Sequence, residues 1–351
     1  MKFISIFILP ALLLYGCKSH TGRHSGSFAT LGNDSTLPAL VCLDTLQSSA
    51  FVPTLENQLP QNKNVVYTPA FLYAWNELRE SSNGPLKVPA GNTDLQLVNT
   101  SESYKGTLSP DEYATSVYKN GNSLRIWAAF KKGLPFKDNM DTSENGFKFN
   151  GTSVKAFGMP HFSDKITERI NILYYENDDT FIISITPKDE REEIILAKGF
   201  NTGDSFKDVL QQIKQSTLYG EKERTNGNSA WKYYLSYEDV VLIPIMRFNY
   251  AANYYSIVNQ IIVAGNDELR VDTAKQRNAF VIDEHGAKVE SEATIAVSAA
   301  AAPPPPPGEN EKPHIKKILL DKEFVILLKK KTTDFPYFMM RVNNTDIMVK
   351  R

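Results

Sequence analysis

This chain of 351 residues is poor in cysteine and has no excess of charge of either sign. Its formal net charge is −1, so it lacks the basic excess that proteins use to neutralise nucleic-acid phosphates. Two cysteines, Cys17 and Cys42, cannot form a disulfide-rich scaffold. Hydrophobic residues make up 42% of the chain, which is enough for a large apolar core. We therefore expect a globular body that does not bind nucleic acid.

Motifs of the common enzyme classes are also missing. The chain contains no G-x-S-x-G, P-loop, G-x-G-x-x-G, H-E-x-x-H or C-x-x-C pattern. Of its histidines, His20 and His24 lie in a polar N-terminal segment, and His161, His285 and His314 stand beside no nucleophile signature. The sequence thus predicts a protein that is not an enzyme and that holds neither a metal nor a cofactor.

The N-terminus has the pattern of a targeting segment. Lys2 precedes an uncharged run over residues 3–16, which is shorter than the roughly 20 residues of a membrane-spanning helix and is typical of a signal peptide. The run ends in Leu14-Tyr15-Gly16-Cys17, which resembles the cleavage box of bacterial lipoproteins. That resemblance implies removal of residues 1–16 and a lipid on Cys17. The alternative is an ordinary secretory signal with an incidental cysteine.

Both alternatives predict export, and a lipidated Cys17 implies an anchor to the cell envelope or cell surface. With that thiol modified, Cys42 has no partner in the chain, and no intrachain disulfide is expected. Residues 17–43 are rich in serine, threonine, glycine and histidine, and they predict a flexible tether. The folded body is expected over residues 44–351.

The body shows patterns of both helices and strands. Apolar spacing predicts a helix over residues 44–59, a second helix that starts at Pro69 with Thr68 as its cap, and a third near residues 206–215. Residues 109–120 are predicted to form a short helix. Asn150-Gly151 predicts a hairpin, and residues 238–250 a long strand with a bend or edge at Pro244. The fold class is therefore α+β.

One segment near the C-terminus combines two patterns that rarely meet. Between residues 287 and 297 small or apolar side chains alternate with polar ones, which predicts a strand with one buried face. The inward positions are Ala287, Val289, Ser291, Ala293, Ile295 and Val297. Four alanines and five prolines follow directly, at residues 299–307, and such a run suits no packed core.

Several stretches resemble serpins, in the order in which that family has them. They are "NVVYTPAFLYAWNEL" (64–78), "AAFKKGLPF" (128–136), "FKFNGTSVKAFGM" (147–159), "EDVVLIPIMRF" (238–248), "AFVIDEHGAKVESEATIAV" (279–297) and "LLDKEFVILLKKKTTDFPYFMMRV" (319–342). The resemblance extends from residue 44 to the C-terminus. It implies several mixed and antiparallel sheets, with helices packed around them and an exposed reactive loop at about 284–313.

The chain also departs from the serpin pattern. Only about 42 residues separate Glu80 from Ser123, where serpins have several helices and two strands. Phe71 stands where the family has a second serine, Gln276 replaces a histidine, and an asparagine is missing from "IWAAF". In serpins these groups form the hydrogen-bonded gate through which the main sheet opens.

The resemblance implies two functions. In the first, a serine protease cuts the loop, and the freed strand inserts into the main sheet and inhibits the protease. Glu284, Gly286 and Ala287 would then form the hinge. Counting from Gly286 places the reactive bond at Ala300-Ala301, which suits an elastase-like protease with a small primary pocket. In the alternative, the strand is already inserted and the protein is a non-inhibitory binding module on the surface.

Overall fold

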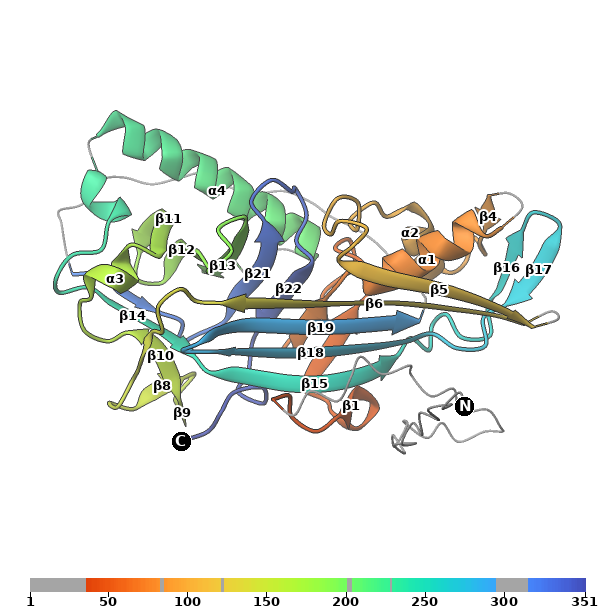
Figure 1. The fold of residues 1–351 in the computed structure, drawn as a ribbon, viewed down its shortest axis with the longest axis horizontal. Coiled ribbons are helices and arrows are strands. Elements are labelled where there is room, and N and C mark those ends of the chain that lie inside the picture. Colours follow the sequence, from red (N-terminus) through yellow and green to blue (C-terminus); the bar gives the residue numbers. More distant parts are fainter. Residues whose placement is uncertain (1–35, 83–84, 121–122, 201–203, 228, 295–314) are drawn as a thin grey trace, which may run out of the picture.

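One sheet contains long strands that lie side by side along the length of the molecule, as Figure 1 shows. The structure is a computed structural model that describes residues 36–82, 85–120, 123–200, 204–227, 229–294 and 315–351. This sheet has six strands in the order β1 (Val41–Cys42), β15 (Met246–Asn253), β18 (Lys275–Asp283), β19 (Gly286–Thr294), β6 (Ser123–Pro135) and β5 (Tyr113–Asn120).

A second sheet of seven strands packs behind the first and supplies much of the core. Its order is β11 (Ile170–Asn177), β12 (Thr180–Ile185), β13 (Glu192–Lys198), β21 (Phe324–Lys330), β22 (Phe338–Val342), β3 (Asn64–Tyr67) and β2 (Ser49–Val52). Phe280 of β18 stacks on Phe338 of β22 with ring centroids 4.5 Å apart, so apolar rings join the two sheets.

Three smaller sheets complete the strand inventory of the described residues. One has the order β20 (Lys317–Leu319), β14 (Val240–Pro244), β10 (Ala156–Met159) and β7 (Asp141–Thr142). Another contains β17 (Asp267–Arg270), β16 (Ile261–Ala264) and β4 (Leu86–Lys87), and β8 (Phe147–Phe149) pairs with β9 (Thr152–Val154).

The described helices cover the sheets at separate places. Helix α1 (Ala70–Glu80) packs against β5, β6 and β19, while α4 (Phe206–Asn226) packs against β11 at the other end of the molecule (Figure 1). Shorter helical pieces are α2 (Thr93–Thr100), α3 (Asp164–Thr167), η1 (Leu43–Thr45) and η2 (Ala230–Tyr233). Within the described part of the chain, no helix combines the length and apolarity needed to cross a membrane. The predicted α+β class with several mixed sheets is confirmed.

Two predicted helices are wrong. Residues 44–59 form η1 and β2 instead, because β2 pairs in parallel with β3 and buries most of its side chains there. Residues 113–120 form β5, whose partner is β6 along its whole length. In both segments pairing with another strand determines the conformation. The spacing of apolar residues within a short segment does not reveal that pairing.

Other local predictions were confirmed only in part. Asn150 and Gly151 adopt positive φ angles of 45° and 83° in the tight turn between β8 and β9. The single long strand predicted over residues 238–250 is wrong, because Pro244 ends β14 and Met246 begins β15 in a different sheet; the predicted bend at Pro244 separates these two strands. Thr68, by contrast, makes no capping hydrogen bond to α1. Its hydroxyl instead donates to Asn278 Oδ1, within a buried cluster described below.

Cys42 does not remain a free thiol. It is disulfide-bonded, and its partner lies outside the described residues. The expectation that the chain forms no disulfide is therefore wrong for Cys42.

Candidate functional site: the strand between β18 and β6

Strand β19 lies between two strands that run in the same direction. It is antiparallel to β18 from Asp283–Gly286 to Lys275–Thr294, and antiparallel to β6 from Gly286–Pro135 to Ala293–Ala128 (Figure 1). Because both neighbours oppose β19, β18 and β6 are parallel to each other. The alternating segment of the sequence thus fills a position in the middle of the six-stranded sheet.

This placement corrects one expectation and confirms another. The predicted exposed loop over 284–313 is wrong for residues 286–294, which are a central strand. The predicted inward side is confirmed at Ala287, Val289, Ser291 and Ala293, all of which are at most 4% exposed. Ile295 and Val297 lie outside the described residues.

The start of β19 explains why glycine stands at the predicted hinge. Gly286 has φ 141°, and a Cβ atom there would lie 2.4 Å from the carbonyl oxygen of Leu134. In the turn before it, the carbonyl of His285 accepts a hydrogen bond from the amide of Phe136, and that of Glu284 from the amide of Met140. The backbone of the hinge is therefore held tightly against the end of β6.

Buried polar side chains meet under the middle of β19. The Ser291 hydroxyl lies 2.6 Å from Asn278 Oδ1 and 2.7 Å from the Thr68 hydroxyl, and all three residues are fully buried. Gln276 donates to Thr68 Oγ1 and accepts from the Tyr254 hydroxyl (2.6 Å). These five residues form what we call the inner polar cluster.

The inner polar cluster includes one of the positions at which the sequence departs from the serpin pattern. At this position Gln276 takes part in the hydrogen bonding. The sequence carried a signal for this cluster, because Ser291, Asn278 and Gln276 are polar at inward positions of two neighbouring strands. A buried polar group needs a partner, so such positions predict mutual contacts.

Carboxylates are buried on the opposite, outer face of β19. Glu290 is 0% exposed, and its carboxylate lies 2.7 Å from Lys131 Nζ of β6 and 3.7 Å from Arg277 Nη1 of β18. Glu292 is 1% exposed and accepts a hydrogen bond of 2.5 Å from the indole N–H of Trp127. The alternation assigned both residues to the polar face but gave no sign that they would be buried.

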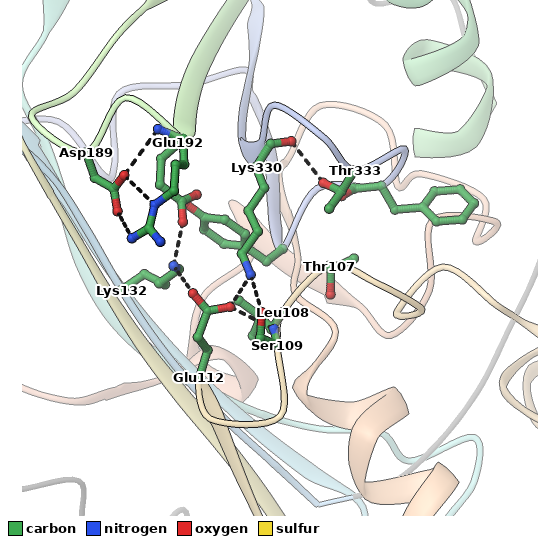
Figure 2. A network of polar contacts seen from close by, with 12 residues as sticks. Thr107, Leu108, Ser109, Glu112, Lys132, Asp189, Glu192, Lys330 and Thr333 are labelled. Carbon is green, nitrogen blue, oxygen red and sulfur yellow. Dashed lines mark hydrogen bonds and ion pairs between the residues drawn. The ribbon is translucent and has the colours of Figure 1, made fainter.

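A network of charged residues ties the neighbouring strand β6 to the second sheet, as Figure 2 shows. Lys132, opposite Val289 in the register, donates to Glu112 (2.6 Å) and to Glu192 of β13 (2.5 Å), and Lys330 of β21 also binds Glu112. Burial acts to raise the pKa of Glu112, but hydrogen bonds from Lys132 and Lys330 outweigh it and lower the pKa to about 2. This network holds β6 against the second sheet. We call the position of β19, between β18 and β6, the slot.

No family model matches the chain, and no curated protein matches it. Solved structures do. A cleaved serpin 42Da shares 14% identity, over 64% of this chain and 57% of that one, with a TM-score of 0.41. The loop-inserted structure of a cleaved ovalbumin mutant shares 14% identity, over 83% and 72%, with a TM-score of 0.37. The thermophilic serpin tengpin in its latent state shares 10%, over 66% and 58%, at 0.35.

The chain is similar to serpins. It spans less than two thirds of the length of the first serpin named above. At identities of 10–14% the similarity concerns the fold alone and assigns no residue a role. The roles considered below are argued from the contacts of this chain.

Not all residues marked by the resemblance to serpins can be placed. Glu284, Gly286 and Ala287 lie together at the turn between β18 and β19. Ala300, Ala301 and Cys17 lie outside the described residues. Within the described part of the chain no cluster of histidine, cysteine or carboxylate side chains is arranged to hold a metal ion.

The chain beyond the undescribed residues 295–314 is anchored in a different sheet from β19. Strand β20 pairs in parallel with β14. Just before it, the ammonium group of Lys316 is buried and lies 2.8 Å from the Asp239 carboxylate, and it donates to the Trp231 carbonyl (3.1 Å). An ion pair buried this deeply opposes removal of β20 from its sheet, because separation would leave a buried charge without its partner.

Proposed function

We propose that the protein is an exported, serpin-like inhibitor of a serine protease, which acts by cleavage of the 284–313 segment and insertion of its first part into the six-stranded sheet. The observation that supports this most is the fit of β19 to its slot. Its inner face meets apolar side chains and the inner polar cluster, and its outer carboxylates meet Lys131, Arg277 and Trp127.

The free energy of the sheet also favours β19 inserted in the slot over β19 outside it. Without β19, β18 and β6 would face each other as parallel strands. With β19 between them, two antiparallel ladders form, and Ala287, Val289 and Ala293 leave water. Insertion of this segment is therefore favourable, and favourable insertion is what such an inhibitor requires of its loop.

The target protease follows from the residues at the proposed reactive bond. Ala300 and Ala301 present methyl side chains, which fit a small, elastase-like primary pocket. The test is incubation of the exported chain with elastase-like and trypsin-like proteases, followed by a denaturing gel. The proposal predicts a covalent complex with the elastase-like enzyme. Ala300→Arg is the matched variant and should transfer the complex to the trypsin-like enzyme.

A second function is favoured by one specific observation. Strand β19 occupies its slot in a chain that has not been cut. If this arrangement is the resting state, little strand is left to insert after cleavage, and the protein is a non-inhibitory binding module on the cell surface. Cleavage near Ala300 without a covalent complex, and without a rise in the melting temperature, would establish this function and contradict inhibition.

Attachment to a membrane through Cys17 is the second part of the proposal. The disulfide at Cys42 opposes this attachment, because the chain has two cysteines and a lipid on the Cys17 sulfur would leave Cys42 without a partner for an intrachain disulfide. Mass spectrometry of the mature N-terminal peptide, with and without reduction, distinguishes the two. A lipidated peptide supports the anchor, and a peptide released only by reduction contradicts it.

A further inference from the structure

On the outer face of β19, two carboxylates lie among cations from both neighbouring strands. The register places Lys131 opposite Glu290 and Arg277 opposite Glu292. Five residues make up this outer-face cluster: Trp127, Lys131, Arg277, Glu290 and Glu292. Burying a carboxylate is costly unless a charge or a hydrogen bond compensates it.

The two carboxylates of the outer-face cluster are compensated differently. Glu290 has three cations within 4 Å, at 2.7 Å (Lys131), 3.7 Å (Arg277) and 3.9 Å (Lys288). Arg277, which the register places opposite Glu292, thus binds Glu290. Glu292 accepts its hydrogen bond from the neutral indole of Trp127. One anion is therefore paired with charge, and the other is buried against a neutral donor.

We propose that the outer-face cluster makes insertion of β19 dependent on pH, with Glu290 as the carboxyl that lies among cations and Glu292 as the carboxyl that takes up a proton when the strand enters the sheet. This concerns the strand on which the proposed inhibition rests, but its test needs no protease.

The direction of the effect follows from the surroundings of Glu292. Burial raises its pKa to about 7, although the hydrogen bond from Trp127 and the charge of Arg277 act to lower it. In an expelled, solvated strand the same carboxyl titrates near 4.5. Between these two values the inserted state binds a proton that the expelled state lacks. Acidification through pH 7 therefore stabilises the inserted strand, and alkaline pH weakens it.

Among the residues that the structure describes, the other charged groups on this face are lysine, arginine and carboxylate side chains. By register, β6 presents Arg125 and Lys131, β18 presents Lys275, Arg277 and Asp283, β15 presents Arg247, and β19 itself adds Lys288 and Glu290. The reference pKa values of lysine and arginine lie above the range from pH 5.5 to 8.5, and that of aspartate lies below it.

The experiment is thermal unfolding of the exported chain from pH 5.5 to 8.5 at constant ionic strength. Glu292→Gln keeps the acceptor for Trp127 and removes the ionisable group, and Glu238→Gln is the control at an exposed carboxylate. The melting temperature of E292Q relative to that of the unsubstituted protein should rise by about 4 °C from pH 5.5 to pH 8.5, with most of the rise below pH 7. E238Q should follow the unsubstituted protein throughout.

Trp127 provides a second readout that a purely structural role would not change. Its emission should titrate with a midpoint near pH 7, and this transition should be absent in E292Q and in Trp127→Phe. Glu290→Gln should melt lower at every pH, because it leaves Lys131 and Arg277 without their anion. A difference between E292Q and the unsubstituted protein that does not vary with pH would overturn the proposal, as would an emission that does not titrate.

Discussion

Val289 offers a direct test of whether β19 is a core strand in solution. Its side chain is 0% exposed on the inner face of β19. Val289→Ala removes two carbon groups at about 0.8 kcal/mol each, and the cavity raises the loss of unfolding free energy to about 2 kcal/mol. For a chain of this size we expect the melting temperature to fall by about 4 °C.

The matched control makes the same chemical change in the same sheet. Val41→Ala affects the short edge strand β1, where the side chain is 36% exposed, and its effect should stay within about 0.5 kcal/mol. Differential scanning calorimetry of both variants gives the comparison. If V289A and V41A melt alike, Val289 is not packed in a core, and the placement of β19 in the sheet is refuted.

Three further predictions concern the slot around β19. Gly286→Val should lower the melting temperature in calorimetry by several degrees, because its Cβ would collide with the Leu134 carbonyl; normal melting would contradict the tight hinge. Ser291→Ala should cost about 1 kcal/mol in urea unfolding, since it removes the buried hydroxyl that bonds to both Asn278 and Thr68; a neutral result would contradict the inner polar cluster. The pKa of Glu112 is lowered to about 2, so its stabilisation is present above pH 4.5 and is lost as the pH falls towards 2; urea unfolding of Glu112→Gln should lack this loss, and an unchanged acid profile would contradict it.

Patterns that depend only on neighbouring residues predicted much of the fold. The alternation from residue 287 onwards found β19 and its inward side, and Asn150-Gly151 found a tight turn because only a few residues adopt its positive φ angles. The helix near residue 206 was found as well, and it runs further than predicted, to Asn226.

The remaining features depend on pairing with other segments of the chain, some adjacent and some distant in the sequence. β5 became a strand because β6 pairs with it, although its own residues also suited a short helix. The burial of Glu290 requires Lys131, which lies on another strand 159 residues earlier in the chain. A single sequence does not show which distant cation will meet a given carboxylate.

The central claim is that residues 286–294 of the uncut chain form a strand within the six-stranded sheet. Hydrogen–deuterium exchange with mass spectrometry, applied to the intact protein, tests it most directly. The account predicts that amides of this segment exchange as slowly as those of its neighbour β18. Exchange within seconds, at the rate of a solvated loop, would contradict it.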